Sequence, residues 1–171
     1  MDSNYRVGEV SYTKYGTKAT IIEYKNNKFK VIDYGAITTP STMNDIKRLE
    51  KIYKGIYILI KNYNIDEVAV EELFFNKNVK TAITVAQARG VILLGCAHNN
   101  KPTYEYTPLQ VKQGVVGYGR AKKIQVQQMV TSILNLSEIP KPDDIADALA
   151  VAICHANANK LEKTLKNIGI K

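Results

Sequence analysis

The chain has little of the chemistry that many enzymes use: no tryptophan, two cysteines and two histidines among 171 residues. Cys96 and Cys154 lie in apolar stretches without C-x-x-C spacing, which predicts buried thiols in a reducing compartment rather than a zinc site. His98 and His155 form no metal-binding motif, and neither a P-loop nor a serine nucleophile elbow is present. No apolar run approaches the roughly 20 residues of a membrane helix, and no apolar leader opens the sequence. We therefore expect a cytoplasmic protein.

Length and charge set the broad class. The hydrophobic fraction of 45% and the charged fraction of 23% are ordinary for a globular protein. We expect one domain over residues 1–160, followed by a basic tail over residues 161–171. Lysine and arginine total 24 against 16 acidic residues, a formal charge of +8. Such a balance indicates a polyanionic partner without identifying it.

The hydrophobic pattern predicts a mixed α/β sheet with helices packed on its faces. Residues 7–12, 19–24 and 29–34, rich in β-branched and aromatic side chains, predict a three-stranded meander. Helices are expected over residues 46–63, with Thr42 as part of a capping signal, 79–98, 121–134 and 143–157. Short strands are expected over residues 67–70 and 102–106. A turn or two of helix near residues 109–113 should lead into a loop containing Gly114, Gly117 and Gly119.

A set of acidic residues gives the first functional hypothesis. Glu71 ends an apolar strand, and Asp144 and Asp147 share one face at the start of a helix. Carboxylates are the ligands that Mg²⁺ prefers, and two such ions about 3.5–4 Å apart support phosphodiester hydrolysis. Acids in a first helical turn also favour the helix dipole, so spacing alone leaves Asp143, Asp144 and Asp147 open as capping residues.

Four longer strings are more specific: AVEELFFNKN at residues 69–78, AQARGV at 86–91, YTPLQVKQGVVGYGRAKKIQVQQMV at 106–130 and DDIADALAVAICHA at 143–156. In order and spacing they resemble the RuvC-type Holliday junction resolvases of the ribonuclease-H-like superfamily, over roughly residues 22–158. The resemblance implies an antiparallel three-strand meander extended by parallel strands, with helices on both faces. It also implies a homodimer that resolves Holliday junctions in DNA recombination and repair by metal-dependent phosphodiester hydrolysis.

The resemblance assigns roles by position. Glu71, Asp144 and Asp147 match three of four metal-site carboxylates, which implies two Mg²⁺ ions per site, with Mn²⁺ as a substitute. Lys123 matches a catalytic lysine at the scissile phosphate. The strings that resemble DNA contacts contain Phe74, Lys77, Asn78, Arg89, Lys112, Arg120, Lys122 and Lys123.

Simple physics favours several of these roles. Lysines beside glycines can approach phosphates closely, and such contacts fix position without reading bases. An aromatic ring such as Phe74 can occupy unstacked space at a branch point, although Phe74 and Phe75 could equally be core residues. His155 resembles the family's histidine near the end of this helix, a position that favours histidine in any case.

Two partners besides junction DNA are implied. Matched cuts in two strands need two sites, which a two-fold dimer supplies. Ala82, Ala86 and Gly90 would let a second helix approach closely, although this helix could equally pack on its own sheet. A branch-migration helicase complex is the further partner that the resemblance implies.

The chain departs from the family at its first strand, where the motif G-I-D-P-G supplies the fourth carboxylate. Aligned without gaps, Ser11 falls on that aspartate. A serine hydroxyl is a poor substitute for an anionic metal ligand. Glu9, two residues earlier on the same strand face, could reach the site in part. Three hypotheses therefore stay open: an active junction nuclease, an impaired junction-binding dimer, and a phage-type nuclease acting on other branched DNA.

Overall fold

The computed structural model describes residues 5–13, 16–26, 28–72, 79–141 and 143–167, with the side chains of residues 12, 13, 16, 79–81, 144 and 163–167 left out. One five-stranded sheet with the order β3-β2-β1-β4-β5 organises this part of the chain. Strands β1 to β3 form an antiparallel meander, and β4 and β5 run parallel to β1. The strands are β1 (Tyr5–Thr13), β2 (Gly16–Lys25), β3 (Lys28–Thr38), β4 (Glu67–Glu71) and β5 (Thr103–Tyr106).

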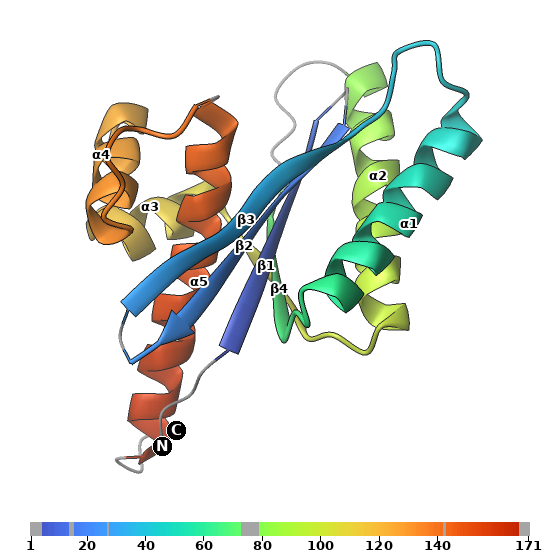
Figure 1. Ribbon diagram of the computed structural model, residues 1–171. Helices are drawn as coiled ribbons and strands as arrows, with labels where there is room; N and C mark the ends of the chain where they lie inside the picture. Colours follow the sequence, from blue (N-terminus) through green and yellow to red (C-terminus); the bar gives the residue numbers. More distant parts are fainter. Residues whose placement is uncertain (1–4, 14–15, 27, 73–78, 142, 168–171) are drawn as a thin grey trace.

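Helices cover both faces of the sheet, as Figure 1 shows. Two of them pack on one face: α1 (Asp45–Asn62) and α2 (Val79–His98). The opposite face carries α3 (Pro108–Val116), α4 (Lys123–Ile133) and α5 (Asp143–Asn167). Because side chains alternate along a strand, Val7 and Ala69 join the core under α5, whereas Val10 and Val68 join the core under α1 and α2. The expected fold, a mixed sheet between two helical layers, is confirmed.

Local signals explain where the helices begin and end. The Asn44 side chain accepts a hydrogen bond from the Ile46 backbone N–H and so caps α1, which places the cap two residues beyond the expected Thr42 signal. Helix α3 begins with a reciprocal capping box between Thr107 and Gln110. It ends at Gly117, whose φ of 90° suits glycine.

The expected loop at Gly114 is wrong in part, because α3 continues through Gly114 to Val116. A side chain at Gly114 would collide with Cys154 of α5, so this glycine serves close helix packing rather than a turn. Helix α5 is longer than expected and runs to Asn167 instead of residue 157. Cys96 and Cys154 are buried free thiols, as predicted. None of the described helices is both long and apolar enough to cross a membrane.

Gly114→Ala should destabilise the fold. An added Cβ would lie 2.6 Å from Cys154 Sγ and 3.2 Å from its Cα, so α3 and α5 must separate. Overpacking of this kind costs about 1–3 kcal/mol. Chemical denaturation of both proteins should show the loss as a lower midpoint with an unchanged slope. Gly35→Ala is the control, because nothing lies within 4 Å of its added Cβ. Equal midpoints for Gly114→Ala and the parent would contradict this packing.

Candidate active site

The sheet face under α5 carries polar side chains at the end where β1 and β4 finish. Glu9 pairs with Thr20 of β2 and with Ala69 of β4, and Ser11 pairs with Lys18. Val10 pairs with Val70, so Ser11 follows at the level of Glu71. Residues two apart on a strand share a face, which brings the side chains at positions 9, 11, 18, 20 and 71 to one side of the sheet.

Helices α4 and α5 add the opposite wall of this site. Lys123, the first residue of α4, places its Nζ 3.1 Å from Asp147 Oδ2 and 3.5 Å from Asp143 Oδ2. The hydrogen bond to Asp147 raises the pKa of Lys123, so its ammonium group is held in the charged form. Lys123 and Asp147 also interact with the Glu71 carboxyl of β4, so three separate elements, β4, α4 and α5, bring these side chains together.

Glu71 shows the electrostatic character of the site. Burial raises the pKa of the Glu71 carboxyl, the nearby charge of Asp147 raises it further, and Lys123 acts in the opposite direction. The carboxyl groups of Glu71 and Asp147 thus lie close enough to interact, and a divalent cation would offset their negative charge. Of the acids expected to meet, the structure brings the strand-end Glu71 near Asp147 at the start of α5.

Glu9 forms the floor of the site and is completely buried, with 0% relative exposure. Its Oε2 accepts a hydrogen bond from Thr20 Oγ1 at 3.2 Å. Its Oε1 has no hydrogen-bond partner among the described residues. Burial raises the pKa of Glu9 well above its ordinary value, and the charges of Glu71 and Asp147 act in the same direction.

Lys18 is a further cation at the site that the sequence analysis does not select. Burial lowers the pKa of this amine, while Asp147 and Glu9 act to raise it and Lys123 to lower it. The pairing of Lys18 with Ser11 follows from the β1–β2 hairpin register. A hairpin alignment of residues 5–13 with residues 16–25 is the sequence signal that could have found it.

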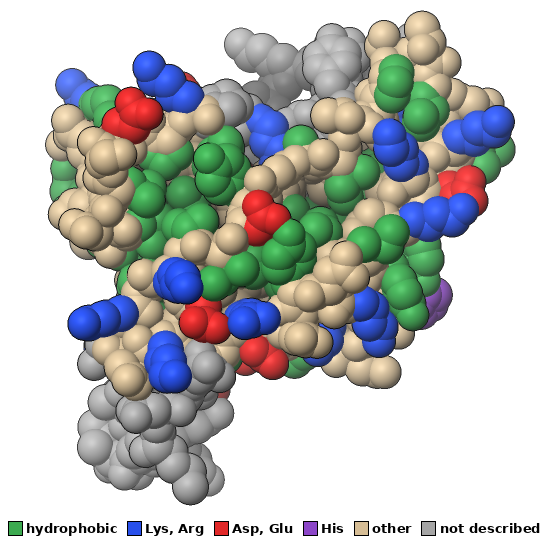
Figure 2. Space-filling view, in the orientation of Figure 1, with side chains coloured by type: hydrophobic (Ala, Val, Ile, Leu, Met, Phe, Trp, Pro, Cys, Tyr) green, Lys and Arg blue, Asp and Glu red, His purple; other side chains and the backbone are tan. Residues whose placement is uncertain are grey.

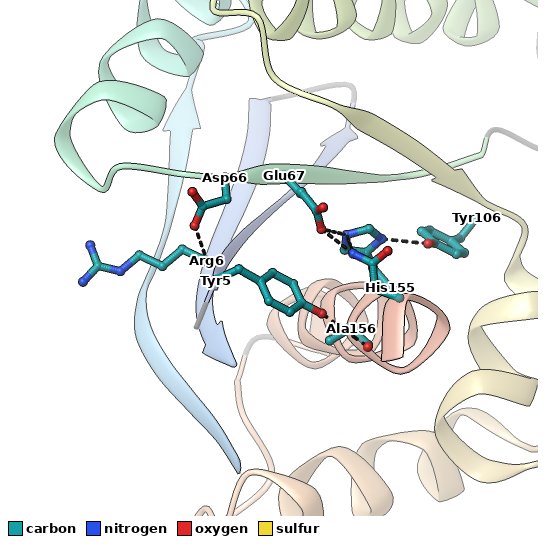
Figure 3. A network of polar contacts seen from close by, with 8 residues as sticks. Tyr5, Arg6, Asp66, Glu67, Tyr106, His155 and Ala156 are labelled. Atoms are coloured by element: carbon teal, nitrogen blue, oxygen red, sulfur yellow. Dashed lines mark hydrogen bonds and ion pairs between the residues drawn. The ribbon is translucent and has the colours of Figure 1, made fainter. Parts of the chain in front are cut away.

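At the opposite end of β4, a second polar group fixes α5 on the sheet (Figure 3). His155, itself 0% exposed, places Nε2 2.8 Å from Glu67 Oε2 and Nδ1 2.7 Å from the Tyr106 hydroxyl. A neutral ring that donates from Nε2 and accepts at Nδ1 satisfies both partners. Tyr5 donates its hydroxyl to the Ala156 carbonyl at 3.3 Å. These contacts join α5 to β1, β4 and β5.

The structure places the other predicted site residues on several different elements. Lys122 is the N-cap of α4, Arg120 is exposed just before it, and Lys112 is half-buried on α3. Arg89 on α2 forms an ion pair with Glu105 of β5, on the other side of the sheet from α4 and α5. The backbone of Asp144 lies in the first turn of α5. Outside the described residues or side chains lie Phe74, Phe75, Lys77, Asn78 and the Asp144 carboxylate.

The donor chemistry of the site suits a hard divalent cation. Glu71, Asp147 and Glu9 offer carboxylate oxygens, and the buried Glu9 Oε1 still lacks a partner. Within the described part of the chain, no three His, Cys, Asp or Glu side chains stand close enough to form a complete metal centre. The acids therefore approach one another without closing on a common point.

Comparison with known proteins adds the family. A family model described as crossover junction endodeoxyribonuclease RuvC matches residues 12–155, starting one residue after Ser11. A crossover junction endodeoxyribonuclease RuvC of Clostridioides difficile is 79% identical over 151 residues, covering 88% of this chain and 89% of the relative. One from Alkaliphilus oremlandii is 62% identical over 146 residues, covering 85% and 89%.

Solved structures agree with the sequence comparison. The Thermus thermophilus RuvC in complex with Holliday junction substrate superposes with a TM-score of 0.87 at 30% identity, covering 92% of this chain and 96% of that one. The yeast mitochondrial Holliday junction resolvase Ydc2 shares the fold, with a TM-score of 0.72 at 11% identity, covering 96% and 84%.

Glu9→Gln should make the folded chain more stable at neutral and alkaline pH. Because the folded-state pKa of Glu9 is raised, the parent has its full stability below about pH 4.5 and loses part of it as pH rises toward the folded pKa. An uncharged amide escapes that loss. Thermal unfolding from pH 4 to 9 should show a melting-temperature difference that grows with pH to a few degrees, since about 1 kcal/mol corresponds to roughly 2–4 °C at this size.

The exposed Glu72→Gln is the control for this experiment, because the same chemical change at an exposed side chain buries no charge. A Glu9→Gln difference that stays constant across the pH range would contradict the buried acid.

Proposed function

Because the chain belongs to the crossover junction endodeoxyribonuclease RuvC family, we propose that it resolves four-way DNA junctions by metal-dependent phosphodiester hydrolysis. The observation that carries the proposal is the convergence of Glu71, Asp147 and Lys123 from β4, α5 and α4. We further propose that the chain acts in recombination and repair in the cytoplasm, where its two buried thiols stay reduced.

In this mechanism the side chains divide into acids that bind cations and lysines that bind phosphate. Glu71, Asp147 and Asp144 would hold the divalent cations, with Mg²⁺ the expected ion, two per site and Mn²⁺ as a substitute. Bound there, the cations would supply an activated water and charge stabilisation for the leaving oxygen. Lys123 is tied to Asp147 at 3.1 Å, and on substrate binding its ammonium group can move to a phosphate oxygen and offset the charge that develops there.

A set of basic side chains near the site can hold the DNA backbone. Lys122 and Arg120 precede Lys123 on the exposed segment between α3 and α4, and Lys112 lies on the neighbouring helix α3. Such groups contact phosphates and position the duplex without reading bases. We assign Phe74, Lys77, Asn78 and Arg89 to the same DNA-facing role by resemblance.

Positive charge also extends away from the site. Figure 2 shows lysine and arginine side chains spread over the face that carries the β2–β3 hairpin and α1. Exposed lysines on these elements include Lys25, Lys28, Lys30, Lys47, Lys51 and Lys54. Distributed charge of this kind raises the rate of association with a polyanion, and a branch-migration helicase complex stays the expected further partner.

Helix α2 is the proposed dimer contact. Ile83 and Leu94 are 56% and 48% exposed, and Ala86, Gly90 and Ala97 are exposed between and beyond them. These five positions recur at helical spacing and form an apolar stripe on the outer side of α2. A stripe with small residues at its centre suits close packing against the same stripe of a second copy.

Glu71→Gln should abolish cutting of a labelled synthetic four-way junction while leaving junction binding intact. The amide cannot hold a cation, but it removes none of the lysine contacts to phosphate. We expect the cleavage rate to fall by at least about 100-fold, which is comparable to the cost of removing one key transition-state group. The dissociation constant for the junction should stay within about threefold of the parent value.

Glu72→Gln is the matched control for this cleavage assay. Glu72 is the next residue after Glu71, and its exposed side chain points to the opposite face. Equal rates for Glu71→Gln and the parent would remove Glu71 from the site. Junction binding without cutting by the parent itself, in Mg²⁺ and in Mn²⁺, would contradict the nuclease proposal.

Ile83→Glu should convert the dimer to a monomer. A charge on the α2 stripe would be buried without a partner in the proposed dimer. Sedimentation velocity should show the change, with Ile46→Glu on α1 as the control, because Ile46 is 77% exposed on another helix. A dimeric Ile83→Glu protein would place the interface elsewhere.

A further inference from the structure

A hollow between strand β3 and helix α1, the β3–α1 groove, lies apart from the nuclease site. We propose that this groove is a docking site for an extended, acidic peptide segment of a partner protein. The segment adds to the outer edge of β3, places apolar side chains in the groove and pairs its acids with lysines of α1.

The β3–α1 groove is large enough for side chains of a ligand and is lined mainly by apolar residues. Its volume is about 290 Å³. Ile21, Ile37, Ile58 and Leu59 are among the residues that line it. Ile58 is 52% exposed, so this wall of the groove meets solvent in the unbound protein. Covering an exposed apolar wall of this kind favours binding.

Two glycines give the groove its shape. A side chain at Gly55 of α1 would collide with Ile37, so the helix touches β3 at that point. A Cβ at Gly35, two residues before Ile37 on the same strand face, would meet nothing within 4 Å. The strand therefore lacks a side chain where the helix leaves room, and a side chain from another molecule can occupy that space.

The outer edge of β3 suits an added strand. Strand β3 ends the sheet and pairs with β2 alone among the described residues, and residues 33–36 are exposed (Figure 1). A peptide that extends such an edge gains affinity from main-chain hydrogen bonds and specificity from its alternate side chains. Alternate side chains of the added strand would point to the face that α1 covers, which is the face of the groove.

Helix α1 surrounds the groove with positive charge. It carries five basic and two acidic side chains, and both acids pair with a basic residue of the same helix. Lys51 and Lys61 are exposed, and they lie seven residues before and three residues after Ile58, on the same side of the helix. An apolar wall between lysines complements a segment with an apolar centre and acids on both sides of it.

This combination favours a peptide over DNA. Lysines alone would serve a phosphate backbone, but DNA bound through them would leave the apolar groove and Ile58 unused. The groove also lies on the other face of the sheet from the nuclease site, because Ala19 and Ile21 line it whereas Lys18 and Thr20 alternate with them on β2. A partner can therefore bind here without covering the nuclease site.

Peptide selection on the full chain tests the proposal. A phage-displayed library of random short peptides is selected on the parent and depleted on Gly35→Leu, whose side chain fills the groove. We expect the surviving peptides to carry apolar residues at alternate positions, with Asp or Glu on both sides. Fluorescence anisotropy of a labelled surviving peptide should show an affinity for Gly35→Leu at least about tenfold below that for the parent, the scale of losing a buried anchor.

Lys51→Glu is a second variant, which reverses a charge beside the groove. We expect it to bind the same peptide about three- to tenfold more weakly, with a smaller dependence on NaCl, because salt screens the attraction between exposed charges. Lys141→Glu makes the same change at an exposed lysine before α5 and should bind as the parent does. If thermal unfolding shows that Gly35→Leu does not fold, Ile58→Glu at an exposed helix position replaces it in both experiments.

Several results would overturn the proposal. They are the absence of any peptide after depletion, surviving peptides without acidic residues, and equal affinity of the parent and Lys51→Glu for the peptide. Loss of four-way junction binding by Gly35→Leu would make the groove a DNA contact instead. A changed sedimentation coefficient of Gly35→Leu would make it a contact between copies. Junction cleavage is measured separately, so failure of the nuclease proposal leaves these results unaffected.

Discussion

The geometry of the site depends on how α5 is fixed along β4. Asp147 and His155 are eight residues apart on the helix, which corresponds to about 12 Å, and Glu67 and Glu71 are four residues apart on the strand, which corresponds to about 13 Å. The two elements run in opposite directions, so the bond between His155 and Glu67 at one end sets Asp147 beside Glu71 at the other. A buried histidine far from the chemistry thus determines whether the two acids meet.

The sequence predicted this fold well, because hydrophobic periodicity reports which face of an element is buried. It could not predict that Gly114 lies inside α3, because that position is decided by Cys154 on a helix 40 residues later. It predicted Glu71, Asp147 and Lys123 as a group from motif order. It did not predict the link from Glu67 to His155 or the position of Lys18, since these depend on strand register and on the placement of α5.

Glu9 and Ser11 show why position along a strand matters as much as residue type. A carboxylate at the strand end meets water and neighbouring charges, whereas a carboxylate two residues inside is enclosed by Thr20 and the sheet. Burial of an acid is costly, so such a residue is tolerated when the surrounding structure or a ligand compensates. Within the sheet, the Glu9 carboxyl therefore stays closer to its neutral form than an exposed glutamate would.

Strand β3 forms an outer edge of the sheet, and Lys28 and Lys30 stand exposed near its start. An uncovered edge strand can recruit the edge of another copy, and lysines are a common means of preventing this. Mutual repulsion between such edges would keep molecules apart at high concentration. With the dimer contact proposed on α2, aggregation and ordered pairing would be governed by different parts of the surface.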